Sequence, residues 1–497
     1  MKNLAPLFES LEQGMSYKNI PGVKIYEQSY IKHNDVTLLM VKNGSVKWLL
    51  AAGIGCLYDD LKGTEVQEKR KVCPLIHDNR IVLNRYFDYT NPQSFGPETT
   101  TIGLGDRLGL ASPGHIQTVR NKTIKPILAQ QSIRELTLTG RSMEDILDAA
   151  SFAVFQEGYK GGFGADGDHL KQEADIESAL RNGVSMLTLD CSDYIYNDVE
   201  IEDSGWIRSQ YKKLPLFVKN RYKEQYLNKT FEIGHLSLIF DEISLMKNVL
   251  LYREAIAYMV HIYNKYVSTE EKDVDFEISI DETDTTTSPK DHFFVANELQ
   301  LEGVRVTSLA PKFCGEFQKG IDYIGDVEQF EDELKVHSLI ADYFGYKLSI
   351  HSGSDKFKVF PLVSRYTQGR FHLKTAGTNW LEAVRVIAEK HPDLYRQMHR
   401  YAMEHFEETR QYYEVTPDLE KIKLLDSVDD KELPHYMDND SSRQLFHVTY
   451  GLLLTARDEK GRYLFRHKFF STLNEHENRY TEALVSHIGN HLEELGL

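Results

Sequence analysis

The stretch VDFEISIDET, residues 274–283, decides between the fold classes open to this chain. Apolar and polar residues alternate along it with the period of a β-strand. The two faces are Val274, Phe276, Ile278 and Ile280 on one side, and Asp275, Glu277, Ser279 and Asp281 on the other. A strand of an α/β barrel packs its apolar face on the outer helices, so the polar face points inward. Buried carboxylates are costly unless they are paired, protonated or bound to metal, so this strand predicts an interior site.

The same alternation recurs in three other strand-like runs: YKLSIHS (346–352), FHLKT (371–375) and MLTLDCSD (186–193). A solvated face of an antiparallel sheet explains one such strand. It explains four poorly, because helices cover the outside of barrel strands. We therefore expect the polar ends of several strands to meet at the carboxyl rim of a barrel, where this fold places its chemistry.

Strand-like and helix-like segments alternate over residues 96–390. Eight strand-like runs with helices between them predict a (β/α)8 barrel. The runs are TTIGLGD (100–106), IRELTLTG (133–140), GGFGADGDH (161–169), SMLTLDCSD (185–193), FEISIDETD (276–284), RVTSLAPKF (305–313), YKLSIHSGS (346–354) and FHLKTAGT (371–378). An open doubly wound sheet is the alternative, but no GxGxxG turn opens it.

Two further zones flank this predicted α/β barrel. Residues 1–95 hold short β-like runs and predict a β-rich N-terminal extension, and residues 391–497 have a helical pattern. The longest interruption of the barrel, about 195–235, predicts an inserted loop or lid.

Bulk properties exclude several classes of partner. The net charge of −17 argues against nucleic acid and anionic membranes, which attract basic surfaces. The four cysteines form no CxxC pair, which favours free thiols in a reducing compartment. The chain shows no leader-like start and no apolar run of membrane-spanning length, so we expect a cytoplasmic protein with a small-molecule substrate. Whether it forms a homo-oligomer stays open.

The run GADGDHLK, residues 164–171, ends a glycine-rich strand with Asp168 and His169. An Asp-x-Asp turn on its own is often structural, because each carboxylate can accept from nearby backbone amides. Together with His351 and the inward carboxylates, it favours an active site. Two histidines from different strands plus a carboxylate make the open divalent-metal site used by catalytic zinc or manganese.

We predict His169 and His351 as metal ligands, with Glu316, in APKFCGEFQKG, as the third. His292 and His372 compete for that third position. His337 lies in an amphipathic helix pattern and is more typical of a structural histidine.

Three cations are candidates for binding an anionic substrate group. Lys356 and Lys374 belong to glycine-, serine- and threonine-containing loops that follow the last two predicted strands, where this fold often binds anions. Arg107, near the first strand, suits a carboxylate, although it can equally pair with an internal acid.

Several long motifs in order resemble the tagaturonate epimerase family: GLGDRLGLASPGH, GADGDHLK, DETDTTTSPKDHFFVANEL, VTSLAPKFCGEFQKGIDYIGD, LSIHSGSDKF and HLKTAGTNWLEA. The resemblance implies a metal-dependent isomerase of hexuronate catabolism that interconverts D-tagaturonate and D-fructuronate, with a divalent cation such as Zn, Mn or Ni. Related sequences are also associated with C4 epimerisation of the neutral sugars tagatose and fructose.

The same resemblance implies Asp168 as proton acceptor and His169 and His351 as metal ligands. An acidic residue of the fifth strand would be the proton donor, with Glu277 first and Glu282 second.

The chemistry favours retro-aldol cleavage and re-addition, because the inverted carbon lies β to the ketone and its C–H is not appreciably acidic. Two other functions would use the same barrel. One is a class II metal-dependent aldolase that releases its fragments. The other is a non-catalytic barrel that stabilises an aldolase partner, which would predict a degraded metal site.

Overall fold

The computed structural model describes residues 4–13, 20–196, 203–283, 285–410, 413 and 415–497. Eight strands form a closed barrel, with neighbouring strands parallel in each register that is defined, such as Glu277 opposite Thr188. In barrel order they are β12 (Asp275–Ser279), β13 (Ser308–Ala310), β14 (Lys347–Ile350), β15 (Phe371–Lys374), β6 (Thr101–Gly103), β7 (Lys125–Ser132), β8 (Gly164–Leu170) and β9 (Met186–Asp190). The predicted (β/α)8 class is confirmed.

Seven of the eight predicted strand runs contain an observed strand, and the run IRELTLTG is wrong. Its residues form helix α5 (Ile133–Thr139), which begins at Ser132, whose hydroxyl accepts from the Glu135 amide, and ends at Gly140 with φ +64°. The strand lies just upstream, in β7. Leu136 and Thr139 are buried in α5 while Thr137 is exposed. The buried residues are therefore spaced as in a helix, although the sequence suggested the alternation of a strand.

The chain divides into two compact units. The first holds residues 1–92, 104–163 and 376–490, and the second holds residues 93–103, 164–375 and 491–497. Seven of the barrel strands, and every residue of the cluster described below, belong to the second unit.

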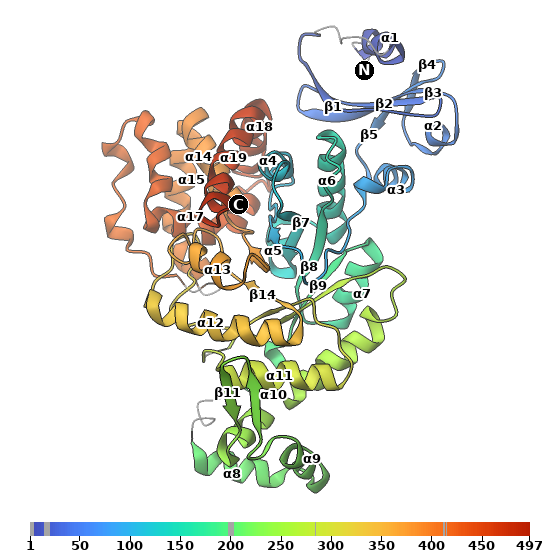
Figure 1. Cartoon of the computed structure of the whole chain (residues 1–497). Coiled ribbons are helices and arrows are strands. Elements are labelled where there is room, and N and C mark those ends of the chain that lie inside the picture. The colour runs from blue at the N-terminus through green and yellow to red at the C-terminus, as the bar shows by residue number, and fades with distance from the viewer. Residues whose placement is uncertain (1–3, 14–19, 197–202, 284, 411–412, 414) are drawn as a thin grey trace. The chain divides into compact units, whose positions relative to one another are not determined.

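In the first unit, an antiparallel sheet has the strand order β1-β2-β3-β5-β4. Helix α1 (Ala5–Gln13) packs its leucines and Phe8 on one face, and α3 (His77–Tyr86) and α6 (Met143–Gln156) pack on the other (Figure 1). The strands are β1 (Val23–His33), β2 (Val36–Asn43), β3 (Val46–Gly53), β4 (Thr64–Gln67) and β5 (Arg70–Pro74), with α2 (Cys56–Asp60) after β3.

The rest of the first unit is mainly helical and shares one large apolar core around Trp380, Tyr395 and Phe446. Its helices are α4 (Ser112–Val119), α14 (Thr378–Lys390), α15 (Pro392–Glu404), α16 (Phe406–Arg410), α17 (Asp440–Thr455), α18 (Arg466–Glu475) and α19 (Glu477–Glu494). The β-rich N-terminal extension and the helical C-terminal region are both confirmed.

In the second unit, the long helices α10, α11 and α12 accompany the barrel strands, and α8, α9 and the hairpin β10-β11 lie beside α10 and α11 (Figure 1). Their bounds are α7 (Glu173–Asn182), α8 (Ser204–Lys213), α9 (Leu216–Tyr226), β10 (Thr230–Ile233), β11 (Leu236–Ile239), α10 (Glu242–Ile262), α11 (Pro289–Leu301), α12 (Val327–Phe344) and α13 (Phe360–Tyr366). None of the described helices combines the length and apolarity needed to cross a membrane.

Candidate active site

A β-bulge at the end of β8 presents Asp168 and His169. The strand pairs with β9 as far as Gly167, and the register then shifts before Leu170. A Cβ on Gly167 would lie 2.8 Å from Leu170 Cδ1 and 3.1 Å from Ala179 Cβ, so a larger residue there would require these buried side chains to shift. His169 adopts φ +51°, a conformation unusual for a residue with a side chain. Bulges re-aim side chains near active sites, and this one directs two neighbouring polar groups into one cluster.

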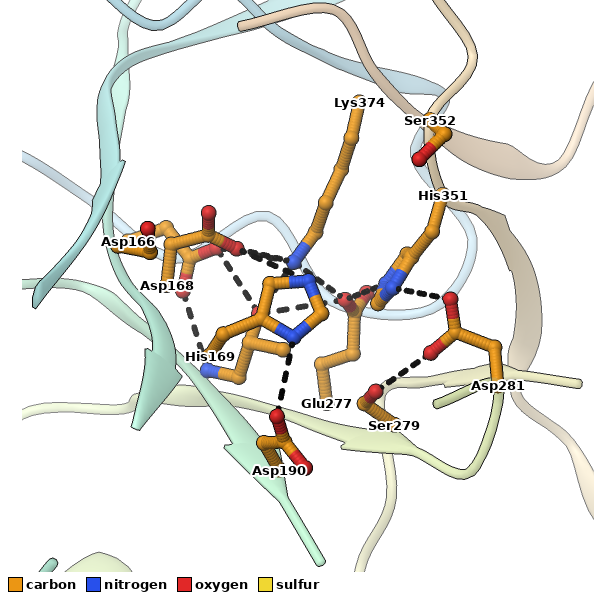
Figure 2. Close-up of polar contacts among 12 residues, drawn as sticks. Asp166, Asp168, His169, Asp190, Glu277, Ser279, Asp281, His351, Ser352 and Lys374 are labelled. Carbon is orange, nitrogen blue, oxygen red and sulfur yellow. Dashed lines mark hydrogen bonds and ion pairs between the residues drawn. The ribbon is translucent and has the colours of Figure 1, made fainter. Parts of the chain in front are cut away.

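Lys374, the last residue of β15, lies at the centre of this cluster (Figure 2). Its Nζ donates to Asp168 Oδ1 at 2.5 Å and to Thr188 Oγ1 at 2.9 Å, and it lies 3.0 Å from Glu277 Oε1. Asp166 Oδ2 is 3.6 Å away. Four strands, β8, β9, β12 and β15, therefore contribute polar groups around one ammonium.

Glu277 is fully buried and bonded on both oxygens. Oε1 lies 2.8 Å from His351 Nε2 and accepts from Thr188 Oγ1 at 3.2 Å, and Oε2 accepts from Ser308 Oγ at 2.6 Å. The other ring nitrogen of His351, Nδ1, lies 3.1 Å from Asp281 Oδ2. Glu277 thus connects the Lys374 side of the cluster to the histidine side.

Burial and neighbouring charges shift the pKa values of these side chains in opposite directions, and at most of them the neighbouring charge prevails. Burial alone would raise the pKa of Asp168 and of Glu277, but the Lys374 ammonium outweighs it and holds both pKa values below their ordinary range. Burial does prevail at Asp166, whose pKa is raised to about 6. Burial would lower the pKa of His351, but the Asp281 carboxylate raises it to about 9.

The histidine side of the cluster has the donors that a divalent cation needs. Ligand atoms of His169, Asp190 and Glu282 lie within 4.8 Å of one another, and the ring of His351 is centred 4.8 Å from that of His169. His169 Nδ1 is buried and 3.6 Å from Asp190 Oδ2, and it makes no hydrogen bond to another described residue. The pKa of His169 is raised because Asp168 outweighs burial. Carboxylates surrounding two imidazoles favour a cation, so this donor set fits a catalytic metal ion.

The structure brings together five of the predicted residues: Asp168, His169, Glu277, His351 and Lys374. Glu316 is exposed, and its carboxylate accepts from Gln318 Nε2. The Lys356 ammonium is buried and donates to three backbone carbonyls, those of Gln318, Ser354 and Ile321.

Arg107 belongs to the first unit. There its guanidinium pairs with Glu135 at 2.5 Å and stacks on the ring of Tyr450.

The competing histidines have partners of their own. His292 Nδ1 lies 2.8 Å from His337 Nδ1, and His292 Nε2 lies 2.6 Å from Tyr346 Oη. Burial lowers the pKa of His337 to about 4 and that of His372 to about 3. His372 Nδ1 lies 2.8 Å from Thr101 Oγ1, one inward layer below Lys374.

Sequence reasoning did not single out Thr188, Asp190 and Asp281 as site residues. Thr188 and Asp190 lie on the inward face of β9, and Asp281 continues the inward alternation of Glu277 and Ser279 past the end of β12. Ser279 Oγ donates to Asp281 at 2.6 Å and orients it toward His351. The alternation along VDFEISIDET already placed Asp281 on the inward face, but it assigned no role to this residue.

Comparisons with known proteins identify the family of this chain. The model of the tagaturonate epimerase family (UxaE) matches residues 26–495. A tagaturonate/fructuronate epimerase from Thermotoga maritima is 40% identical over 477 residues, which cover 95% of this chain and 97% of that protein.

Two crystal structures of fructuronate-tagaturonate epimerase UxaE from Cohnella laeviribosi are also similar to this chain. The native structure has 55% identity, a TM-score of 0.95 and full coverage of both chains. A glycerol complex has 57% identity and a TM-score of 0.93, covering 95% of this chain and 96% of that one. This chain therefore belongs to the tagaturonate epimerase family.

Proposed function

We propose that this protein is a metal-dependent epimerase that interconverts D-tagaturonate and D-fructuronate. The observation that carries the proposal is the single buried cluster in which Asp168 and Glu277 flank Lys374, and His169 and His351 lie edge to face beside them. The match to the epimerase family over nearly the whole chain and the names of its relatives supply the substrate class.

We propose that His169 and His351 hold the metal ion, with a carboxylate oxygen as a further ligand. Asp190 and Glu282 are better placed for this than Glu316, because their oxygens cluster with the His169 imidazole. Two imidazoles and a carboxylate suit Zn, Mn or Ni. A bound ion would act as a Lewis acid and stabilise negative charge that develops on the substrate.

Asp168 and Glu277 are proposed to take and return the proton. Both carboxylates are held ionised beside Lys374, so Asp168 is ready to act as a base toward a substrate hydroxyl, whereas Glu277 must take up a proton before it can return one. Glu277 belongs to a different strand from Asp168, and the Lys374 ammonium lies between the two carboxylates. This placement suits a proton donor that acts on the opposite side of a substrate carbon. Glu282, which is exposed, is the alternative proton donor.

Retro-aldol chemistry accounts for the inversion with these groups. Asp168 removes the proton from the hydroxyl on the carbon to be inverted, the adjacent carbon–carbon bond breaks, and an aldehyde and an enediolate result. The aldehyde rotates, the bond re-forms on its other face, and the acid returns the proton to the new alkoxide. No proton leaves carbon at the inverted centre, which avoids removing a hydrogen that the ketone does not acidify.

Sugar NMR of the purified protein tests the proposal. D-tagaturonate and D-tagatose are each incubated with Mn²⁺ or Zn²⁺, and in parallel with a chelator. We expect metal-dependent formation of D-fructuronate. Turnover of D-tagatose would extend the activity to neutral ketohexoses, and accumulation of free three-carbon products would instead indicate an aldolase.

Deuterated solvent tests the bond that breaks. Retro-aldol inversion leaves the hydrogen on the inverted carbon in place, and a reactive amine or hydrazine should trap the aldehyde fragment. Solvent deuterium at the inverted carbon without any trapped fragment would contradict the retro-aldol step and leave the epimerase activity standing.

A further inference from the structure

Lys374 donates two hydrogen bonds inside the protein and forms a close ion pair with Glu277. A lysine ammonium offers three donors and no acceptor. Its Nζ lies 2.5 Å from Asp168 Oδ1, 2.9 Å from Thr188 Oγ1 and 3.0 Å from Glu277 Oε1, and the side chain is only 6% exposed. The carboxylates of Asp166, Asp168 and Glu277 already surround the ammonium, so these contacts do not favour Lys374 as a substrate anchor.

The partners of Lys374 are the two groups to which the proposed reaction assigns the proton. Asp168 and Glu277 come from strands on either side of β9, and both lie within contact of the one ammonium. Two carboxylates that met without a cation between them would repel each other in a buried site. The ammonium lies within contact of both carboxylates and offsets this repulsion.

We propose that Lys374 is a positioning residue that holds the general base Asp168 and the proton donor Glu277 in working geometry through one shared ammonium. This inference rests on the proposed function. Thr188 completes the arrangement, because its hydroxyl accepts from Lys374 and also lies within hydrogen-bonding distance of Asp166 and Glu277.

A purely structural role for Lys374 is the competing explanation. Three buried carboxylates, Asp166, Asp168 and Glu277, surround this one cation. Removing the lysine would leave them uncompensated, so a loss of activity by itself would not separate positioning from stability.

The second-site change Asp166→Asn separates the two roles. It removes one negative charge and keeps the size of the side chain, and the amide can still bond to the Thr188 backbone and hydroxyl, which now contact the carboxylate. In the double variant Lys374→Met/Asp166→Asn the charge deficit is smaller while the shared ammonium is still missing. Asp166→Asn alone shows what the second change does by itself.

Lys347→Met is the matched control. Lys347 is also a buried lysine of a barrel strand in the same unit, but its Nζ donates to the backbone carbonyls of Gly96 and Thr99. Its removal takes away the same kind of buried charge, and although that charge acts on Glu277 at a distance, the Lys347 ammonium donates to backbone carbonyls and not to Asp168 or Glu277.

The four variants and the wild type are assayed with D-tagaturonate and saturating Mn²⁺, and their melting temperatures are measured. We expect Lys374→Met to lower kcat by roughly 100-fold or more, the range for misplaced acid–base groups, with KM changed by less than about threefold. The double variant should regain thermal stability and keep the low kcat. Lys347→Met should retain kcat.

Recovery of kcat in the double variant would overturn the proposal in favour of charge compensation. A large rise in KM with kcat preserved in Lys374→Met would overturn it in favour of a substrate anchor.

Wild-type turnover in the same assay tests the proposed function separately. If the wild type is inactive, crystal structures of the wild type and the double variant still test the positioning, because we expect the Asp168 and Glu277 carboxylates to move apart when the ammonium is absent. Unchanged carboxylate positions would overturn it.

Discussion

The two ends of the barrel in the second unit treat buried charge in opposite ways. At the amino end, Lys347 donates to the carbonyls of Gly96 and Thr99, and Asp275 accepts from the amides of Phe95 and Gly96. At the carboxyl end, Lys374 bonds to Asp168 and contacts other carboxylates and a hydroxyl. Both lysines and Asp168 are buried to a similar degree.

The two ends of the barrel differ in the kind of group that contacts each buried charge. Lys347 and Asp275 bond to backbone groups, which have fixed positions and do not titrate, and so fasten the 95–99 segment to the barrel, while the Asp275 carboxylate also favours the charge on Lys347. Side chains at the carboxyl end are ionisable and face one another, so a proton, a cation or a substrate group can change their charge balance. Burial of a charge alone therefore does not mark a functional site, whereas a buried charge among other titratable side chains does.

The largest expected effect is on catalysis at the carboxyl end. Asp168→Asn keeps the shape of the side chain and removes the proposed base, so we expect kcat to fall by roughly 10² to 10⁴-fold. Interconversion of D-tagaturonate and D-fructuronate followed by NMR measures it.

The matched change at the amino end is Asp275→Asn. It weakens the bonds to Phe95 and Gly96, and we expect a loss of about 1–3 kcal/mol of stability with kcat within a few fold of wild type. Equal losses of kcat in Asp168→Asn and Asp275→Asn would contradict the distinction between a catalytic carboxyl end and a structural amino end of the barrel.

The second prediction compares the two lysines through the pH dependence of stability. Burial lowers the pKa of Lys347 to about 8 in the folded protein, below its unfolded value near 10.5. The unfolded chain therefore binds more protons between pH 8 and 10.5, and stability rises with pH across that window. A shift of this size corresponds to about 3 kcal/mol. The charged ammonium costs that amount below pH 8 and is relieved above it.

Denaturant unfolding of the wild type and Lys347→Met across this window measures the effect, because the difference between them isolates the Lys347 contribution. We expect the wild type to gain on the variant as pH rises. For Lys374 the carboxylates raise the pKa, so its stabilisation is present below the unfolded value and is lost only above it. The difference between the wild type and Lys374→Met should stay flat in the same window, and a rise there would contradict the contrast.

Much of this arrangement follows from local patterns in the sequence. Period-two alternation identified β12, β14, β15 and β9 and placed Glu277, His351 and Lys374 on inward faces. The run GADGDH pointed to Asp168 and His169. Its bulge was not foreseeable, because a register shift depends on how β9 packs beside Gly167.

The partners of each charge depend on long-range contacts that no local pattern contains. Lys356 and Lys374 both lie close to small residues after predicted strands, yet one donates to backbone carbonyls and the other to Asp168. For Arg107 the sequence left an internal acid as one alternative, and Glu135 is its partner here. The helix α5 was mistaken for a strand because Ile, Leu and Thr alternate in it, while the capping Ser132 and the terminal Gly140 were the better local signals.

The smallest expected effect concerns a hydroxyl beside a carboxylate. Ser279 Oγ donates to Asp281 at 2.6 Å, and the other oxygen of Asp281 lies 3.1 Å from His351 Nδ1. Groups that orient a metal ligand typically change metal affinity by about 10- to 100-fold when removed. Ser279 reaches the His351 imidazole only through Asp281, so we expect an effect at the lower end of this range. Ser279→Ala should lower Mn²⁺ or Zn²⁺ affinity by about tenfold, measured by competition with a chelating dye.

The corresponding hydroxyl at the amino end belongs to Thr307, which lies 3.5 Å from Asp275 Oδ1 and accepts from the Phe276 amide at 3.2 Å. Thr307→Val removes it with little change in shape, and we expect metal affinity to stay at the wild-type value. A matching loss of affinity in Thr307→Val would mean that barrel stability, and not the orientation of Asp281, sets the affinity. Unchanged affinity in Ser279→Ala would instead show that Asp281 does not orient His351. Either result would shift, along β12, the boundary between residues that stabilise the barrel and residues that support metal binding.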